Sequence, residues 1–324
     1  MSSIMTNASA LTALQSLNAT NKSLQQTQAR ISTGYRVAEA VDNAAYWSIA
    51  TTMRSDNQAL STVSDSLGLG ASKVDTAYTG MNKAIDTINS IKVKLVAAYG
   101  STDADKEKFQ TEIDTLQKQM KSYADGATFS GTNMLSVSTA SGTAADVKIV
   151  SAFNRDASGK ASISTIDVNV ESIKLYDAGA APDAKGILDT ARLGTTGAAT
   201  TSAQDPTLGD DPATGDTYSV AKLSVKGASD GQIAQMMNVV DAALKDMTNA
   251  ATTLGAAKSS IDLQKTFTTS LMDSIDRGVG QLVDADMNKE STRLQALQVQ
   301  QQLGIQALSI ANSSSQSILS LFKG

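Results

Sequence analysis

Two pairs of neighbouring carboxylates are the residues of this chain whose spacing could support acid–base chemistry. Asp210 and Asp211 precede Pro212 in a stretch rich in Gly and Thr, while Asp284 and Asp286 lie where one helical pattern ends and another begins. Paired carboxylates can serve as general acid and base, and the first pair could also bind a hard cation weakly. A solvated loop accounts for the first pair, and the preference of acids for helix N-termini accounts for the second. We therefore predict no catalytic residues, no cofactor and no metal site.

The residue types that are missing restrict the chemistry further. The chain has no His and no Cys, which excludes Ser–His and Cys–His pairs, imidazole and thiolate metal ligands, and the HExxH zinc motif. The net charge of -5 is opposite in sign to that of a typical nucleic-acid-binding domain. No apolar run approaches the ~20 residues of a membrane span, and residues 1–20 lack the pattern of a cleaved signal peptide. We expect a structural or binding protein, not an enzyme, with no nucleic-acid partner and no membrane span.

Each end of the chain carries a narrow apolar seam whose residues are alternately three and four positions apart. Within residues 283–322 the seam consists of Met287, Glu290, Leu294, Leu297, Gln301, Gly304, Leu308, Ala311, Ser315, Ile318 and Phe322. Within a helix predicted from Ile4 to Ile31 it consists of Ala10, Leu14, Leu17, Asn21, Leu24, Gln28 and Ile31. Such a seam is typical of a coiled-coil helix, which cannot bury its apolar face alone. We predict that the two terminal helices pack on each other, with an ordinary helical bundle as the alternative; Asn21 and Gln28 would weaken the packing but could fix its register.

Two longer heptad patterns lie inside the terminal ones. The first runs from Ala50 to Tyr99 and the second from Ile233 to Leu282, each long enough for a rod of ~75 Å. Such lengths favour a coiled coil, and we expect the two rods to pack antiparallel. Gly68, Gly70 and Gly80 are expected to be weak points of the first rod.

A shorter helix and a small hairpin follow the first rod. The helix is predicted around Phe109–Tyr123, and the hairpin at Thr128–Leu135 turns at Ser130-Gly131. Before the rod, Asp42 or Asn43 is a plausible cap for a helix that starts with Ala44.

Residues 136–228 differ in composition and in hydrophobic periodicity from the helical segments on either side. All three Pro of the chain fall here. Alternating apolar residues predict strands at Val147–Val150, at Ile166–Val170 with a continuation to Ile173 and Leu175, and at Tyr218–Val225. The stretch Gly194–Gly215 is predicted as a long loop, with a disordered linker as the alternative. Because no heptad pattern enters this segment, it is interpreted as a small β-rich insert at the periphery.

The predicted fold is therefore mainly α, with long antiparallel helical rods, paired coiled-coil-like terminal helices and a small β-rich inserted outer domain. Three parts are expected along the chain. They are residues 1–42 with 284–324 as the terminal helices, residues 43–135 with 229–283 as the rod domain with its hairpin, and residues 136–228 as the outer domain.

Motifs at both ends of the chain resemble those of bacterial flagellins. The N-terminal motif residues are Ser16-Leu17-Asn18, Asn21, Leu24, Arg30 to Gly34, Asp42 to Ala45, Ile49-Ala50 and Met53. The C-terminal ones are Ala285-Asp286, Gln300-Gln301, Ala307, Ala311-Asn312 and Ile318 to Phe322. The hairpin is also similar to one in this family. The small insert and Tyr46-Trp47 are most similar to flagellins of rhizobia and related alphaproteobacteria.

The resemblance implies a subunit that self-assembles into the extracellular flagellar filament after unfolded export through the flagellar type III apparatus. The terminal helices would form the inner core and the polymerisation contacts, through Leu14, Leu17, Asn21, Leu24, Ile31, Leu294, Leu297, Leu308, Ala311, Ile318 and Phe322. Asp42, Asn43 and Trp47 would belong to the spoke that joins the core to the rods. The implied partners are further copies of the chain, sister flagellins, the export apparatus, the filament cap and the hook-junction proteins. The insert would form the filament surface, and replacing residues 138–226 by a short linker is expected to leave polymerisation intact.

Two positions depart from the family pattern. Trp47 stands where many relatives carry a small apolar residue, and it either packs against the adjacent rod or contacts a neighbouring subunit. Lys92 and Leu95 stand where enteric relatives carry an Arg and an acidic residue that an innate immune receptor recognises, so this resemblance implies poor recognition.

Two further classes of protein remain as alternatives. A hook–filament junction protein would share the same end helices but would be scarce and would not grow filaments by itself. A secreted helical binding module would be a stable monomer with ordered ends.

Overall fold

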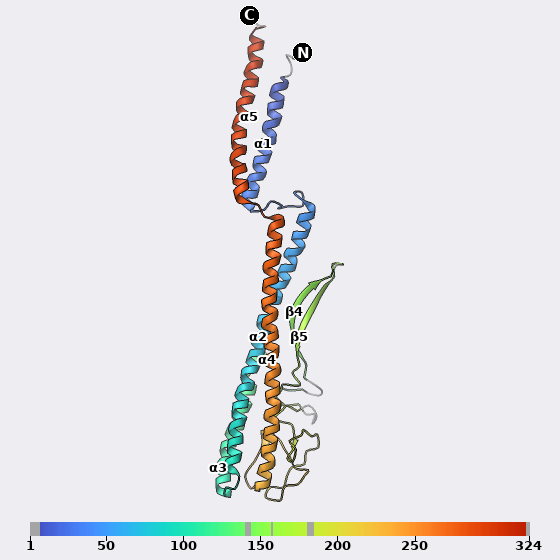
Figure 1. Ribbon diagram of the computed structural model, residues 1–324, viewed down its shortest axis with the longest axis vertical. Coiled ribbons are helices and arrows are strands. Elements are labelled where there is room, and N and C mark those ends of the chain that lie inside the picture. Colours follow the sequence, from blue (N-terminus) through green and yellow to red (C-terminus); the bar gives the residue numbers. More distant parts are fainter. Residues whose placement is uncertain (1–6, 140–143, 157, 180–184, 322–324) are drawn as a thin grey trace. The chain divides into compact units, whose positions relative to one another are not determined.

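The computed structural model describes residues 7–139, 144–156, 158–179 and 185–321, with the backbone alone for residues 314–321. It is mainly helical, as predicted (Figure 1). The helices are α1 (Ala8–Thr33), α2 (Ala44–Ala98), α3 (Asp103–Gly126), α4 (Asp230–Val283) and α5 (Met287–Leu321). The strands are β1 (Thr128–Phe129), β2 (Thr132–Asn133), β3 (Ser136–Val137), β4 (Val147–Arg155), β5 (Ala161–Val168), β6 (Tyr176–Asp177), β7 (Arg192–Leu193) and β8 (Thr217–Tyr218).

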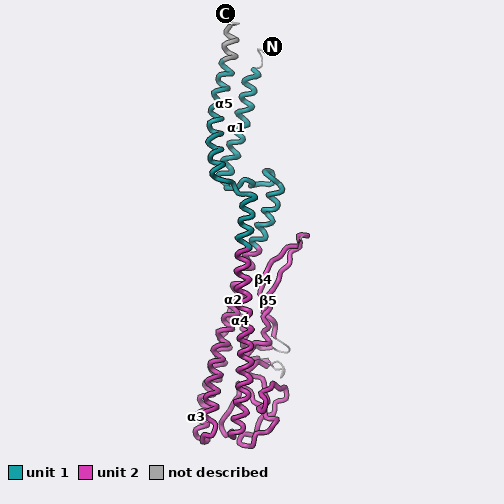
Figure 2. Tube along the Cα trace, in the orientation of Figure 1, with its two compact units in different colours: residues 1–58, 271–324 teal, residues 59–270 magenta. Residues whose placement is uncertain are grey.

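The chain forms two compact units, residues 1–58 with 271–324 and residues 59–270 (Figure 2). Residues that are distant in the sequence therefore meet within each unit. The predicted helix start at Ile4 and the last seam residue, Phe322, lie outside the described residues.

In the first unit, α1 and α5 lie side by side in antiparallel orientation (Figure 1). The side chain of Asn7 caps α1 by accepting a hydrogen bond from the amide of Ala10, which satisfies one of the free donors of the first turn. Gly34 ends α1 with a φ of 76°, a left-handed conformation that glycine adopts without steric cost.

Two short linkers join this helix pair to α2 and α4. The amide of Ala285 donates to the carbonyl of Gly34, and the amide of Arg36 donates to the carbonyl of Val283, so the linkers run along each other. A small apolar core of Val37, Ala50, Val279 and Val283 lies next to them.

The second unit contains most of α2 and α4, together with α3 and all strands. Lys92 forms an ion pair with Asp241, and Lys258 forms one with Asp75, so α2 and α4 are antiparallel as predicted. The predicted seam of α2 is buried at Leu60, Leu67, Val74, Met81, Ile88 and Leu95. A second heptad row of α2 is also buried, at Val63, Ala77, Ala84, Ile91 and Ala98. Two buried rows show that α2 is covered on two sides.

Two glycines of α2 are sites of close packing, which corrects their interpretation as weak points. A Cβ on Gly70 would lie 2.4 Å from the side chain of Ile149, and one on Gly80 would lie 2.8 Å from Leu135. Both distances are shorter than a van der Waals contact, so β4 and the hairpin can approach α2 only because these positions lack a side chain.

The strands form four separate two-stranded pairs. β1 and β2 pair around Ser130-Gly131, both with positive φ, which confirms the predicted hairpin. β4 and β5 form a longer antiparallel ribbon, which confirms the predicted strands at Val147–Val150 and Ile166–Val168. The predicted continuation through Val170 to Ile173 and Leu175 is wrong, because the chain bends and turns after β5 and buries these three side chains in the core. The prediction of a strand over Tyr218–Val225 is wrong beyond Tyr218. There the chain turns into a 3₁₀ helix at Val220–Lys222, which buries Val220. The stretch Gly194–Gly215 is mostly irregular, as predicted, apart from a bridge between Arg192 and Ala199.

The segment predicted as a peripheral insert shares one apolar core with α2, α3 and α4. Its contributions are Ile149, Val168, Val170, Ile173, Leu175, Leu188, Tyr218, Val220, Leu223 and Val225. These side chains pack in the same cluster as Ile113 and Met120 of α3 and Met236 and Val240 of α4. The three-part division of the chain stays a prediction, but the core is continuous across the proposed boundaries at residues 136 and 228.

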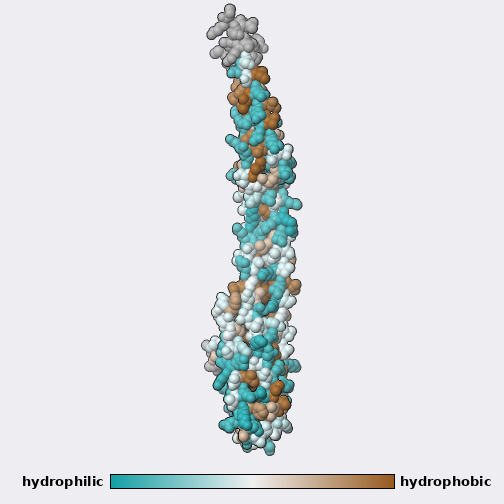
Figure 3. Space-filling view, turned by 90° about the vertical axis from the view of Figure 1, so that its left-hand side faces the viewer, coloured by the Kyte–Doolittle hydropathy of each residue, from teal (hydrophilic) through white to brown (hydrophobic). Residues whose placement is uncertain are grey.

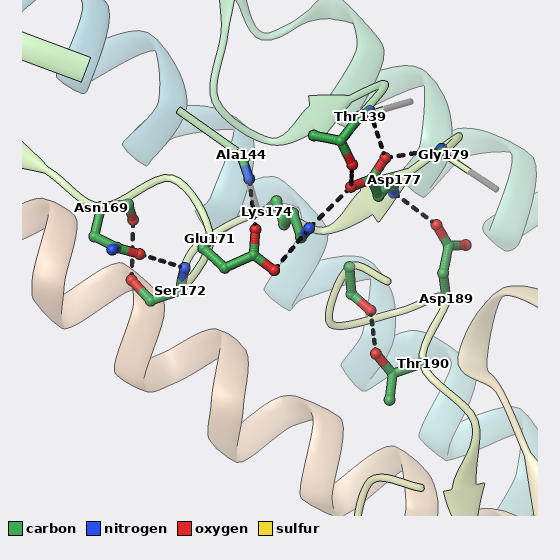
Figure 4. A network of polar contacts seen from close by, with 11 residues as sticks. Thr139, Ala144, Asn169, Glu171, Ser172, Lys174, Asp177, Gly179, Asp189 and Thr190 are labelled. Atoms are coloured by element: carbon green, nitrogen blue, oxygen red, sulfur yellow. Dashed lines mark hydrogen bonds and ion pairs between the residues drawn. The ribbon is translucent and has the colours of Figure 1, made fainter. Parts of the chain in front are cut away.

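A buried polar network orders the turn between β5 and β6 (Figure 4). The fully buried ammonium of Lys174 lies 2.8 Å from Glu171 and 2.9 Å from Asp177. Burial opposes the charged form of Asp177, yet hydrogen bonds from Lys174, Thr139 and Gly179 hold the pKa of its carboxyl well below the usual range. The same two carboxylates raise the pKa of Lys174 despite the desolvation of its ammonium. The network is therefore charged in the folded chain.

Candidate functional site

Of the two carboxylate pairs, Asp286 lies at the N-terminus of a helix, as predicted. The Asp286 side chain accepts hydrogen bonds from the amides of Asn288 and Lys289 and so caps α5. Asp284 pairs with Tyr35 through a backbone bridge, and the carbonyl of Asp210 accepts a hydrogen bond from Ser229. Among the described residues, no group of three or more acidic side chains could hold a metal ion. In the same part of the chain, no helix is both long and apolar enough to cross a membrane.

The terminal pair of α1 and α5 is the candidate site, and the structure brings most of its predicted residues together. Leu17, Asn21, Leu24 and Ile31 of α1 and Leu294, Leu308 and Ala311 of α5 are partly buried, and Leu297 is buried. Leu14 remains 44% exposed. Ile318 lies in α5, but its side chain is outside the described part, as is all of Phe322.

One seam position of α1 differs from the prediction. Gln28 is exposed, and Thr27 is buried in its place. A straight helix has 3.6 residues per turn, so a strict 3.5-residue row drifts off the buried face within a few turns. The register-fixing role that the sequence suggested for Gln28 is therefore wrong, while Asn21 does lie in the pair.

Among the described residues, three polar side-chain contacts join α5 to α1 and its N-cap. The Asn7 amide donates to the carbonyl of Ala311 at 2.8 Å, and the Gln301 amide donates to Asn21 Oδ1 at 2.7 Å. Arg30 pairs with Glu290 at 3.4 Å. Sequence reasoning missed this ion pair, although Glu290 stood out as the charged member of an otherwise uncharged seam.

The helix pair also leaves large apolar side chains uncovered. On α1 these are Leu11 and Leu14, and on α5 they are Val299, Leu303, Ile305 and Ile310, with Ile310 69% exposed. Figure 3 shows apolar residues gathered along the part of the molecule that these two helices form. Isolated exposed apolar residues are common, but a concentration of them along one helix pair marks an interaction surface. Leu14 belongs to the predicted seam, whereas the other five residues lie outside the single row that the heptad pattern follows.

Of the predicted spoke residues, Asp42 and Asn43 lie in a loop that is held by local hydrogen bonds, and Trp47 lies in the first turn of α2. Asp42 accepts hydrogen bonds from the amides of Ala38 and Glu39. Asn43, not Asp42, caps α2 by accepting a hydrogen bond from the amide of Tyr46. Trp47 is 38% exposed, and Val41 is 92% exposed.

Cation–aromatic contacts flank this loop. The guanidinium of Arg54 lies 4.7 Å from the centre of the Tyr35 ring, and that of Arg36 lies 6.0 Å from the Tyr46 ring. Arg36 also donates to the carbonyl of Leu282. These contacts tie the loop to α2 and α4 within the first unit.

Comparisons with known proteins match both ends of the chain. Residues 4–140 match the bacterial flagellin N-terminal helical region, and residues 237–322 match the bacterial flagellin C-terminal helical region. The chain belongs to the bacterial flagellin family. It is 48% identical over 324 residues to the flagellin of Brucella melitensis and 49% identical over 328 residues to flagellin C of Rhizobium meliloti, with 100% of both chains covered in each case. Flagellin A of Rhizobium meliloti is 44% identical over 397 residues.

Family membership confirms the resemblance and its alphaproteobacterial character. As a flagellin, the chain is a structural subunit of the extracellular flagellar filament and polymerises with itself; it is not an enzyme. The full-length similarity to flagellins favours this role over that of a junction protein or a monomeric binding module.

Proposed function

We propose that the subunit polymerises through the terminal pair, with α1 and α5 forming the inner core of the filament. The proposed contact residues are Leu14, Leu17, Asn21, Leu24, Ile31, Leu294, Leu297, Leu308, Ala311, Ile318 and Phe322. The observation that carries this proposal is the set of uncovered apolar side chains on the pair. A helix pair that exposes Leu303 and Ile310 to water gains stability when a second copy covers them, at about 1.5–3 kcal/mol for each side chain.

The loop that holds Asp42 and Asn43, with Trp47 in the first turn of α2, is proposed as the spoke between the core and the rods. Its local hydrogen bonds support a defined conformation, since the side chains of Asp42 and Asn43 accept from nearby backbone amides. The partial exposure of Trp47 supports the interpretation in which a neighbouring subunit covers its remaining surface.

The remaining assignments rest on the family. Residues 1–42 with 284–324 are proposed as the inner core, residues 43–135 with 229–283 as the rod domain, and residues 136–228 as the outer domain on the filament surface. We further propose unfolded export through the flagellar type III apparatus and contacts with sister flagellins, the filament cap and the hook-junction proteins. A strain without this apparatus should retain the chain inside the cell.

Two matched substitutions test the assembly surface. Ile310→Asp places a carboxylate on the proposed interface, whereas Ile163→Asp changes an equally exposed isoleucine of β5 in the proposed outer domain. Burial of an unpaired charge is costly, so Ile310→Asp should abolish filament growth while Ile163→Asp retains it. Electron microscopy of the purified, salt-concentrated proteins reads the outcome. Normal filaments from Ile310→Asp would place the polymerisation contacts elsewhere.

A further inference from the structure

The antiparallel pairing of α1 and α5 has one observed register. The cross-pair contacts join Asn7 to Ala311, Asn21 to Gln301 and Arg30 to Glu290. The residue numbers within each pair add to about 320, as a single fixed antiparallel alignment requires. Gly304 fits the same alignment, because a Cβ there would lie 3.2 Å from Leu17 Cδ1.

The apolar residues alone do not specify this register. In α1 the row of Ala10, Leu17, Leu24 and Ile31 repeats every seven residues. Sliding α5 by one heptad would therefore place one apolar residue of α1 where another had been. Most of these side chains are only partly buried in the pair, so a slip of one heptad would change little apolar contact between the helices.

The polar residues respond differently to the same slip. Residues 294 and 308, which lie seven positions on either side of Gln301, are both Leu. A slip in either direction would therefore place the Asn21 amide against a leucine. Residue 297, seven positions after Glu290, is also Leu, and it would face the Arg30 guanidinium. Both polar side chains would lose their partners.

Burial makes the ion pair sensitive to such a loss. Glu290 is 7% exposed, and its Oε2 has no hydrogen-bond partner among the described residues. The carboxylate therefore depends on the contact of Oε1 with Arg30. A buried carboxylate that faced Leu instead would be uncompensated.

We propose that Asn21–Gln301 and Arg30–Glu290 are the side-chain contacts that determine the register of the terminal pair, in addition to the linker hydrogen bonds of Ala285 with Gly34 and of Arg36 with Val283. This proposal rests on the proposed function, because the register decides which exposed side chains of α1 and α5, such as Leu11 and Ile310, are presented together to a second copy. The four residues position the assembly surface and do not themselves form it.

The absence of Cys from the chain allows a direct test with engineered disulfides. Leu17→Cys with Gly304→Cys reports the observed register, since the Cβ position at 304 lies 3.8 Å from Leu17 Cβ, within the range of a disulfide. Leu24→Cys or Ala10→Cys, each with Gly304→Cys, reports a slip of one heptad. In the observed register, positions 10 and 24 each lie about 10 Å from position 17 along the α1 axis, in opposite directions. Both are therefore too far from position 304 to form a disulfide.

The cross-links are formed by mild oxidation of the full chain, both soluble and in filaments, and intramolecular products are separated from dimers on non-reducing gels. With the polar contacts intact, the 17–304 product in filaments should exceed the slipped products by about tenfold or more. The combination Asn21→Leu, Gln301→Leu, Arg30→Leu and Glu290→Leu should reduce this ratio at least about fivefold. Gln25→Leu, Gln28→Leu, Gln295→Leu and Gln298→Leu, four exposed positions of the same helices, serve as the matched control and should leave it unchanged.

A charge exchange adds a readout that loss of packing would not reproduce. Arg30→Glu alone should lower the 17–304 yield, and Arg30→Glu with Glu290→Arg should restore it. An unchanged ratio in the apolar variant, or equal yields of all three cross-links with the polar contacts intact, would overturn the proposal. Failure of the cysteine variants to form filaments, with the polar contacts intact, would refute the assembly role of the pair, whereas filaments with an unchanged ratio would refute the register role alone.

Discussion

Lys174 is a fully buried cation, and its removal is expected to destabilise the second unit. Lys174→Met leaves Asp177 and Glu171 without their ammonium partner, and breaking a buried pair in this way costs about 3–5 kcal/mol. The matched control is Lys226→Met, which removes an ion pair with Glu107 whose two side chains are mostly exposed. Such a solvent-exposed pair contributes little to stability, so Lys226→Met should change the free energy of unfolding far less than Lys174→Met. Urea unfolding of the soluble variants measures both effects, and equal losses would show that burial does not set the value of the Lys174 network.

Recognition by the receptor for enteric flagellins should be poor. Leu95 is buried in the α2 core and has no carboxylate to accept a hydrogen bond. Lys92 is paired with Asp241 of α4 and offers a point charge instead of a guanidinium fork. A reporter-cell dose response of the monomer, with an enteric flagellin as reference, should show much weaker activation. Equal responses would contradict this expectation.

At the scale of the helix, the terminal pair is expected to fold only on assembly. Ordering a residue costs about 1–2 kcal/mol of backbone entropy, whereas complete burial of a Leu returns about 1.5–3 kcal/mol. Within the pair Leu14 is exposed and Leu17, Leu24, Leu294 and Leu308 are only partly buried. We therefore expect disordered ends in the dilute monomer. Amide hydrogen exchange measures this disorder directly. Protected amides across residues 294–319 in the monomer would contradict the prediction.

Leu308→Asp tests the same helix pair in the assembled state. The carboxylate would lie at a partly buried seam position between apolar side chains, where burial of a charge is costly. The variant should be exported and soluble, with an intact second unit, yet form no filaments. Circular dichroism and microscopy of the purified variant check both halves of this prediction, and normal filaments would show that the α1–α5 seam is not the assembly switch.

At the scale of the whole molecule, the shared core changes what the middle segment is expected to contribute. The sequence pattern predicts that replacing residues 138–226 by a short linker leaves polymerisation intact. In the structure, that replacement would remove Ile173, Leu175 and Val220 from the core that contains Met236 and Val240 of α4. Loss of several buried side chains costs about 2–5 kcal/mol each. We therefore expect the linker variant to lose the ordered second unit and to form no filaments.

A smaller deletion should be tolerated and serves as the control. Phe153 pairs with Ile163 in the β4–β5 ribbon, whose outer half is largely exposed. Replacing residues 153–163 by Asn-Gly closes the ribbon with a two-residue turn and leaves Ile149 and Val168 in the core. This variant should keep its thermal stability and its filaments. If the larger replacement also assembled normally, residues 136–228 would be an independent outer domain.

The local features of this chain could be predicted from its sequence because they depend on residues a few positions apart. The heptad rows of α2 and α4, the cap of α2 near Asn43 and the hairpin turn at Ser130-Gly131 follow from helix period, capping and turn chemistry. The matching seams at the two ends also predicted that α1 and α5 pair, since neither helix can bury its face alone. The sequence motifs in the two terminal helices also indicated the flagellin family.

Tertiary structure decided the features that depend on residues far apart in the sequence. Gly70 is a close-packing site because Ile149 lies against it, and Lys174 tolerates full burial because Glu171, Asp177 and the turn around them surround its ammonium. The burial of Thr27 in place of the predicted Gln28 depends on how α1 packs against α5. The ion pair between Arg30 and Glu290 depends on the register of the same two helices. Helix period predicts which residues share a face, but the neighbour that covers the face is chosen by packing between distant segments.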